Sequence, residues 1–183
     1  MKYLKIATII IASIGVIIFS TLAYNGAFKT VEVQTGQQGG HLLIGLDHKG
    51  SYQKIATVFD KVKQIQQSEK LDSSLFVGVY FDDPASVEEE KLRSFAGFAI
   101  KDSATGLKLI ENHPNLHFQT IEKRYSYFTE METPNMISMI LAVIKAYPAL
   151  GEKIKEDNPK TSGNGLGFEE YHQNFTRFVL QVE

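Results

Sequence analysis

Hydrophobic residues follow two patterns along the chain: one uninterrupted run near the start, and shorter periodic patterns after it. The run covers residues 6–24, and none of these nineteen residues is charged. At about 1.5 Å of rise per residue, a helix of this length nearly crosses a hydrocarbon layer about 30 Å thick. The pattern therefore predicts one membrane-spanning helix within residues 1–27.

Flanking residues indicate how this segment is used. Lys2 and Lys5 precede the run and Lys29 follows it closely, which favours a domain on the extracytoplasmic side. The alternative is a cleavable signal peptide, for which residues 21–23 (TLA) are the best cleavage match. We favour an uncleaved anchor, because the run is long for a signal core and Thr is a mediocre residue at a cleavage site. The predicted localisation is therefore a single-pass membrane protein.

The chain after this run alternates between strand and helix patterns. Residues 41–47 and 75–81 are apolar runs of strand length, and residues 93–101 return as a further strand. Between the first two strands, residues 52–67 carry apolar side chains at helical spacing. The first half therefore predicts the order strand, helix, strand, strand.

The second half predicts the same order. Residues 115–128 form a long strand pattern, and residues 168–172 and 175–182 form two closing strands. A helix pattern begins at Thr133, and Pro148 is expected to kink or end it, with an extension toward Lys155 as the alternative. Thr133 is expected to cap the helix. The residues expected to form its buried stripe are Met136, Ile137, Ile140, Leu141 and Ile144.

These patterns predict an α+β domain over residues 28–183. It is expected to consist of two strand–helix–strand–strand modules, about 40–102 and 115–183, that share one core. A further strand is predicted at 28–35 and a loop at 158–167. Grooves between similar halves are common ligand sites, so we expect a ligand groove where the modules meet.

Composition excludes several classes of function. The chain has 183 residues, 43% of them hydrophobic, and no Cys, so a disulfide scaffold, a thiolate zinc site and a cysteine nucleophile are excluded. Of its 19 basic residues, two lie before the apolar run, so 17 basic and 21 acidic residues follow. That balance predicts no nucleic-acid partner. The five His residues are scattered, so no metal site is predicted.

An acidic pair in a predicted strand is the candidate site. In residues 168–172 (FEEYH), side chains alternate between two faces, so Glu169 and Tyr171 share one face while Glu170 lies on the other. A carboxylate in a groove can bind a cation or act as a general base. The alternative is that these acids lie on a solvated edge strand.

Four segments together resemble the GyrI-like (gyrase-inhibitor-like) small-molecule-binding domain: HKGSYQKI, VGVYFDDP, EEKLRSFAG and FEEY. The chain is most similar to the membrane-anchored branch that includes the testis-expressed endoplasmic-reticulum autophagy receptor. The resemblance implies two modules of the SHS2 type with an aromatic groove between them. It also implies an E-x-Y pattern at Glu169 and Tyr171, and ligand contacts from Tyr52 and Tyr80.

The sequence thus predicts a membrane-anchored domain that binds a small apolar or cationic molecule without catalysis and without a cofactor. Its partners would be this ligand and, through residues 6–24, the membrane. One alternative is a hydrolase of small electrophiles with Glu169 as general base. Another is a membrane-tethered module that binds a protein partner.

Overall fold

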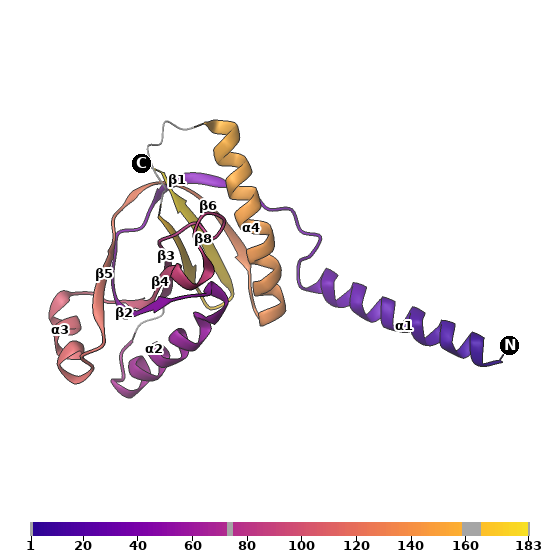
Figure 1. Cartoon of the computed structure of the whole chain (residues 1–183), viewed down its shortest axis with the longest axis horizontal. Coiled ribbons are helices and arrows are strands. Elements are labelled where there is room, and N and C mark those ends of the chain that lie inside the picture. Colours follow the sequence, from indigo (N-terminus) through magenta and orange to yellow (C-terminus); the bar gives the residue numbers. More distant parts are fainter. Residues whose placement is uncertain (1, 73–74, 159–165, 183) are drawn as a thin grey trace.

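The computed structural model describes residues 2–72, 75–158 and 166–182, and within these ranges the chain forms an antiparallel sheet with helices on its outer face (Figure 1). The helices are α1 (Lys2–Tyr24), α2 (Ala56–Ser68), α3 (Ser103–Asn112) and α4 (Met136–Asp157), with 3-10 turns η1 (Tyr52–Lys54) and η2 (Glu89–Lys91). The strands are β1 (Gln34–Gln38), β2 (His41–Lys49), β3 (Phe76–Tyr80), β4 (Arg93–Ala99), β5 (His117–Ile121), β6 (Arg124–Glu132), β7 (Gly167–Tyr171) and β8 (Phe175–Gln181).

The strand order in the sheet is β1-β6-β8-β7-β3-β4-β2-β5. The element order strand, helix, strand, strand occurs twice, as β2-α2-β3-β4 and as β6-α4-β7-β8. The two groups of strands join at the central pair β3–β7, where Gly78 lies opposite Glu169. The middle of the sheet is therefore the boundary between the two halves.

The sheet curls, and alternate residues of its strands point into the curl or out toward the helices. On the outer face, α2 and α3 pack around Val62 and Leu109, whereas α4 packs around Ala142 and Ala146. Because both faces are covered, β3 and β4 are buried on both sides. The inner face is a core of residues from seven strands, namely Leu43, Val77, Val79, Phe95, Ile121, Phe128, Phe168 and Val179.

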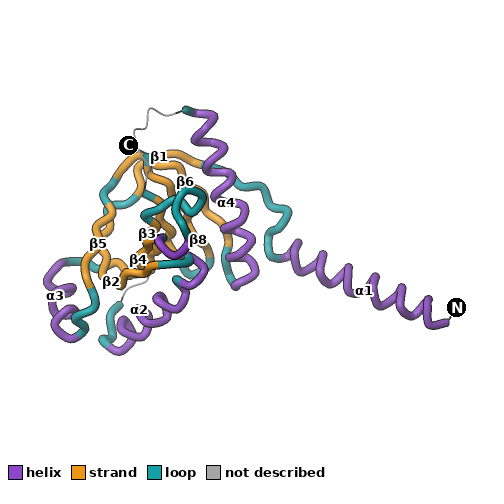
Figure 2. The backbone as a smooth tube through the Cα atoms, viewed as in Figure 1, coloured by secondary structure: helices purple, strands orange, loops and turns teal. Residues whose placement is uncertain are grey.

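Helix α1 projects away from this domain (Figure 1). Residues Lys5–Tyr24 form the apolar part, and none of it is buried within the chain. The helix is long and apolar enough to cross a membrane, although a signal sequence meets the same criterion. An irregular connection then leads to β1 (Figure 2).

Two strand predictions were wrong in their bounds. The strand predicted at 28–35 begins only at Gln34, because the partner residues on β6 pair with Gln34 to Gln38. The long strand predicted at 115–128 is two strands, β5 and β6, separated at residues 122–123. The chain has to turn there, since β5 pairs with β2 whereas β6 pairs with β1 and β8 at the other end of the sheet. Of the loop predicted at 158–167, residues 159–165 lie outside the described ranges.

Two helix starts also differ from the predictions. Helix α3 was not predicted; it begins after Asp102, whose carboxylate accepts a hydrogen bond from the backbone N–H of Thr105. Helix α4 is capped by Asn135 and not by Thr133. Asn135 and Ser138 form a reciprocal capping box, which satisfies the first free N–H groups of the helix. The helix then continues through Pro148 to Asp157.

The buried stripe predicted for α4 was wrong. The residues of α4 that face the sheet are small, Ser138, Ala142 and Ala146, followed by Leu150. Small side chains let the helix approach the rings of the sheet closely. Of the five residues predicted for the stripe, Leu141 is half-buried, and the other four face outward. Their exposed fractions are 78% for Met136, 46% for Ile137, 54% for Ile140 and 62% for Ile144.

Candidate functional site

Glu169 lies at the centre of the sheet, on the face that the helices cover. It belongs to β7, and the opposite residue on β3 is Gly78. A methyl group at Gly78 would lie 3.2 Å from the hydroxyl of Tyr80 and 3.4 Å from that of Tyr171. The absence of a side chain at this position therefore leaves room for both tyrosines beside the Glu169 carboxylate.

Three tyrosine hydroxyls surround this carboxylate. Tyr147 donates a hydrogen bond of 2.6 Å to one oxygen, Oε1. Tyr80 donates to the other oxygen, Oε2, over 3.0 Å, and Tyr171 donates to the same atom. The hydroxyls of Tyr80 and Tyr171 are 3.2 Å apart. Both oxygens of Glu169 are therefore held by neutral donors, and we call Glu169, Tyr80, Tyr147 and Tyr171 the tyrosine cluster.

Two further aromatic rings border the tyrosine cluster. Tyr52 meets Tyr80 edge to face, with ring centroids 4.9 Å apart, and Phe59 of α2 meets Tyr171 in the same way at 5.0 Å. The hydroxyl of Tyr52 points elsewhere and donates to the carbonyl oxygen of Asp82 over 2.8 Å. Tyr52 therefore contributes its ring to the site, whereas its hydroxyl joins the first turn after β2 to the end of β3.

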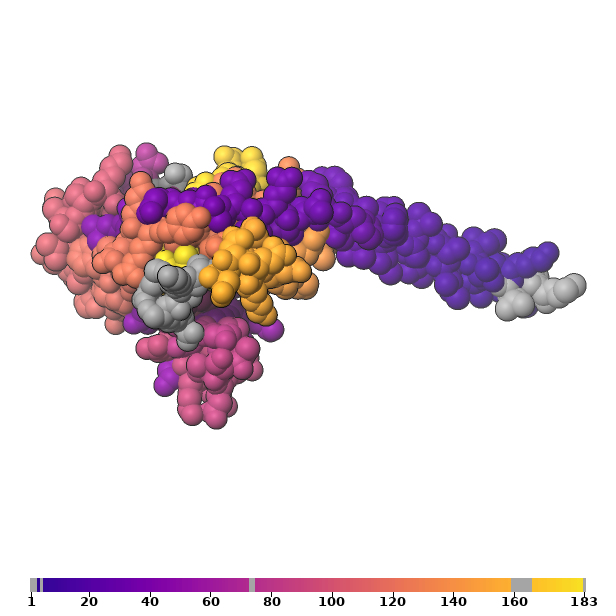
Figure 3. Space-filling view, turned by 90° about the horizontal axis from the view of Figure 1, so that it is seen from above, coloured from indigo at the N-terminus to yellow at the C-terminus, as the bar shows by residue number. Residues whose placement is uncertain are grey.

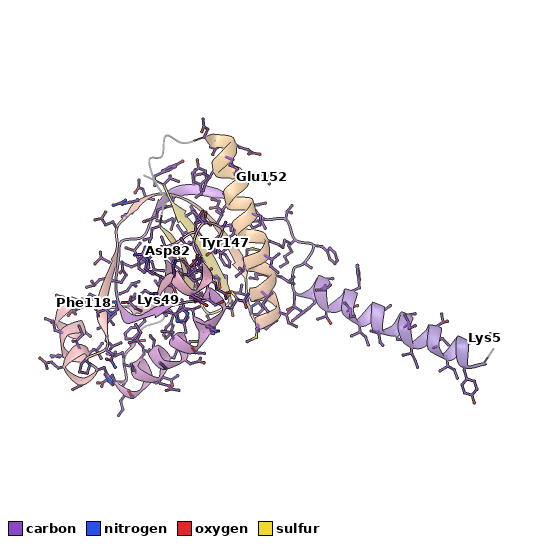
Figure 4. The ribbon with its side chains drawn as sticks, in the orientation of Figure 1. Lys5, Lys49, Asp82, Phe118, Tyr147 and Glu152 are labelled. Carbon is purple, nitrogen blue, oxygen red and sulfur yellow. The ribbon has the colours of Figure 1, made fainter. Side chains whose placement is uncertain are left out.

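The structure brings together all four residues that the sequence suggested, namely Tyr52, Tyr80, Glu169 and Tyr171. Sequence reasoning missed Tyr147, which reaches the site from α4 (Figure 4). The only signal for Tyr147 was an aromatic residue within a predicted helix. Because the predicted buried face of that helix was wrong, the residue could not be directed toward the sheet.

The carboxylate of Glu169 has an unusual environment, because it is buried among neutral donors. Glu169 is 4% exposed. Burial raises the pKa of Glu169, and the hydrogen bonds from Tyr147, Tyr171 and Tyr80 oppose that shift without cancelling it. Burial and the nearby carboxylate raise the pKa values of the three tyrosines well above the ordinary value. Among the described residues, no basic side chain contributes to the pKa of Glu169.

Glu170 provides the contrast on the inner face of the sheet. Its carboxylate lies 2.9 Å from Nη1 of Arg177 and 2.7 Å from Nε2 of His41. Burial acts to raise the pKa of Glu170, but the hydrogen bond from His41 and the charge of Arg177 outweigh it, so the pKa is lowered. Glu170 is thus neutralised within the chain, whereas Glu169 is not.

The predicted family is found by sequence comparison. Residues 41–177 match the family described as the GyrI-like small molecule binding domain. Among curated proteins, none matches the chain in sequence.

Solved structures share the fold at low sequence identity. EcmrR in its complex with DNA has a TM-score of 0.60 and 14% identity, over 98% of this chain and 69% of that one. The protein SAV2435, bound to tetraphenylphosphonium, has a TM-score of 0.57 and 13% identity, over 83% of this chain and 94% of that one. A hydrolase from Listeria innocua has a TM-score of 0.53 and 10% identity, over 84% and 93% of the two chains.

At these identities, the similarity to solved structures shows the fold alone. The family match shows more than the fold, since it covers more than half of the chain. It includes β7, which carries Glu169, the neighbouring strand β3, and α4, which carries Tyr147. The chain therefore belongs to the family of GyrI-like small-molecule-binding domains.

Proposed function

We propose that the protein is a membrane-anchored GyrI-like domain that binds a small lipophilic cation, with Glu169 as the counter-charge. The observation that carries this proposal is a buried carboxylate with aromatic neighbours and, among the described residues, no cationic partner. Burying an unpaired charge is costly unless a compensating charge joins it. A cation that enters the tyrosine cluster would supply that charge.

The aromatic residues favour an apolar cation over a hydrated metal ion. The rings of Tyr80 and Tyr171, whose hydroxyls bond the carboxylate, are extended edge to face by the rings of Tyr52 and Phe59. Aromatic faces attract organic cations and cover their apolar groups. Tetraphenylphosphonium, the molecule bound to SAV2435, combines one positive charge with four phenyl groups and is therefore a suitable probe.

A ligand can reach Glu169 only if tyrosine side chains move. The hydroxyls of Tyr80, Tyr147 and Tyr171 occupy both carboxylate oxygens. Rotation of Tyr80 or Tyr171 away from Glu169 would open space, and the cation would replace the lost hydrogen bonds by charge attraction. The hydroxyl that stays would keep the carboxylate oriented.

Membrane anchoring by α1 is the second part of the proposal. The helix is apolar, and Lys5–Tyr24 is not covered by the rest of the chain. This supports a single-pass protein. The proposal that it belongs to the membrane-anchored branch of the family rests on the sequence resemblance, and the proposed extracytoplasmic side of the domain rests on Lys2 and Lys5 before the helix. The full chain should stay in the membrane fraction through a carbonate wash; a soluble chain that begins after the apolar run would contradict the anchor.

Calorimetric titration with tetraphenylphosphonium tests the binding site. The full chain is placed in lipid nanodiscs, with empty nanodiscs as the blank. Glu169→Gln keeps the shape of the side chain but removes its charge, and should weaken binding by about 1–3 kcal/mol, or about 5- to 150-fold. Glu111→Gln, on the exposed side of α3, is the matched control and should bind as the wild type does. Equal losses in both variants would point to a general charge effect and contradict the site.

A hydrolase with Glu169 as general base is the second candidate, and the raised pKa of this carboxyl is the observation that favours it. A neighbouring tyrosine would then orient the substrate. Incubation with p-nitrophenyl acetate separates the two functions. Turnover that is lost in Glu169→Gln while the affinity for tetraphenylphosphonium is unchanged would support hydrolysis in place of binding.

A further inference from the structure

Helix α4 carries a surface that the fold of the domain does not explain. Large apolar side chains form a continuous exposed strip along its first turns, opposite the small residues that pack on the sheet. We call this strip the α4 ridge; it consists of Met136, Ile137, Ile140, Val143 and Ile144. The second half of α4, in contrast, exposes charged residues such as Glu152 and Lys155. The ridge is therefore confined to one end of the helix.

That end of α4 is bound to the end of α1. The ammonium group of Lys145 donates to the carbonyl oxygens of Gly26 and Ala27, each over 3.0 Å, and also to that of Lys29. These carbonyls belong to the turn that follows α1. A cavity of about 220 Å³ between the two elements is lined by Tyr24 of α1 and Leu141 of α4. The first half of α4 is thus tied to the point where α1 leaves the domain.

The exposed aromatic residues beside this point are of the kind that lies at a membrane surface. Tyr24 is 84% exposed and Phe28 is 65% exposed, and the ring of Phe28 lies 5.2 Å from that of Phe19 on α1. Aromatic residues are enriched where a spanning helix leaves the hydrocarbon layer. If α1 crosses a bilayer, residues 24–28 mark the level of its headgroups.

The direction of the two helices completes the geometry. Figure 1 shows α4 running across the direction of α1, and Figure 3 shows atoms of α4 next to the end of α1. A bilayer that α1 crosses would extend at the level of Tyr24, roughly along the axis of α4. An amphipathic helix that lies in this plane buries its apolar face between the headgroups and the acyl chains.

We infer that the α4 ridge lies in the lipid interface of the same bilayer that α1 crosses. This inference rests on the proposed membrane anchor. A lipid surface is favoured over a second copy of the chain or another protein, because Lys145 holds the ridge where α1 brings lipid to it. The neighbouring turn of α4 carries Tyr147, so the Glu169 site would lie close to the membrane surface.

Tryptophan fluorescence can test the inference in the full chain, which contains no Trp. Three single substitutions are compared in phosphatidylcholine vesicles: Ile144→Trp on the ridge, Ile11→Trp in α1, and Leu107→Trp as a control on α3, where Leu107 is 57% exposed. Each variant is measured with lipids brominated either near the headgroup or near the end of the acyl chain. A far-ultraviolet circular dichroism spectrum and a melting temperature like those of the wild type show that each variant is folded.

We expect Ile144→Trp to lose emission with bromine near the headgroup and Ile11→Trp to lose emission with bromine near the chain end, whereas Leu107→Trp keeps its emission with both lipids. If Ile144→Trp stays bright with both lipids while Ile11→Trp is quenched, the ridge inference is overturned and the anchor stands. If Ile144→Trp is also shielded from iodide, a protein covers the ridge instead of lipid. If Ile11→Trp stays bright with both lipids, the anchor itself is overturned, and the ridge inference with it.

Discussion

Glu169 and Glu170 are neighbours in β7, yet their carboxylates lie on opposite faces of the sheet in opposite electrostatic environments. Glu170 meets Arg177 and His41 inside the curl, and its pKa is lowered. Glu169 meets three neutral hydroxyls under the helices, and burial raises its pKa. A single step along the strand thus separates a carboxylate that pairs with basic side chains from one that is held by neutral hydroxyls.

Substitution of Glu169 is expected to change how stability depends on pH. Because burial raises the pKa of Glu169 in the folded state, the folded protein keeps a proton that the unfolded chain has already lost. The stability of the wild type therefore falls as the pH rises from the ordinary pKa of Glu through the raised one. Glu169→Gln has no such proton, so its free energy of unfolding should rise relative to the wild type over that range. Urea denaturation of the detergent-solubilised chain at several pH values measures this, and a difference that does not vary with pH would refute it.

Tyr147→Phe should make ligand binding more sensitive to acid. The hydrogen bond from Tyr147 lowers the pKa of Glu169, so its loss should raise that pKa further. Tetraphenylphosphonium binding, which requires the ionised carboxylate, should then be lost at a higher pH than in the wild type. Tyr52→Phe is the control, since that hydroxyl donates to the backbone at Asp82 and not to Glu169. Titrations at several pH values should show a shifted midpoint for Tyr147→Phe alone; the same shift in both variants would contradict the assignment.

Glu170→Gln should destabilise the fold. The substitution leaves the guanidinium of Arg177 without its buried charge partner, and loss of a charged hydrogen-bond partner costs about 1–3 kcal/mol. Glu130→Gln is a matched control, because Glu130 binds the same Arg177 but is 42% exposed; an exposed ion pair is worth about 0–1 kcal/mol.

The pH dependence of the free energy of unfolding gives a second measure of how much Glu170 stabilises the fold. Since its pKa is lowered in the folded state, its contribution is present above the ordinary pKa of Glu and is lost as the pH falls through the lowered value. Urea denaturation should therefore show the wild type and Glu170→Gln converging in strong acid. Equal stability of the two proteins at neutral pH would show that the inner carboxylate contributes nothing to the fold.

Gly78→Ala should weaken binding more than it weakens the fold. A methyl group at this position would lie 3.2 Å from the hydroxyl of Tyr80, which would have to move by a few tenths of an ångström, and would touch the hydroxyl of Tyr171. The expected result is a lower affinity for tetraphenylphosphonium with a nearly unchanged melting temperature. Gly151→Ala is the control, because an added methyl group there meets no atom within 4 Å, and Ala in a helix is favoured over Gly by about 0.5–1 kcal/mol. Normal affinity in Gly78→Ala would show that the exact tyrosine positions do not matter.

Many helices and strands of this fold could be predicted from local sequence patterns. Local patterns predicted the apolar helix at residues 6–24, the strands before and after α2, and the closing strands β7 and β8. Each of these elements is defined by side chains only a few positions apart. The alternation of residues 168–172 also separated Glu169 from Glu170 correctly, since neighbouring residues of any strand point to opposite faces. The resemblance to the GyrI-like family selected Tyr52, Tyr80 and Tyr171. In the structure Tyr80 and Tyr171 donate to Glu169, and Tyr52 packs on Tyr80.

The tertiary structure decided the features that depend on partners distant along the chain. The split between β5 and β6 follows from the different strands that they pair with, which no local pattern encodes. The outward orientation of the α4 ridge and the inward reach of Tyr147 depend on which side of α4 meets the sheet. Periodicity identified an apolar face, but close packing on the rings of the sheet required the small face, with Ala142 and Ala146. The charge environment of a buried group is set by its neighbours in space. Only the packing of β7, β8 and α4 therefore decided that Glu170 pairs with Arg177, whereas Glu169 has no cationic partner among the described residues.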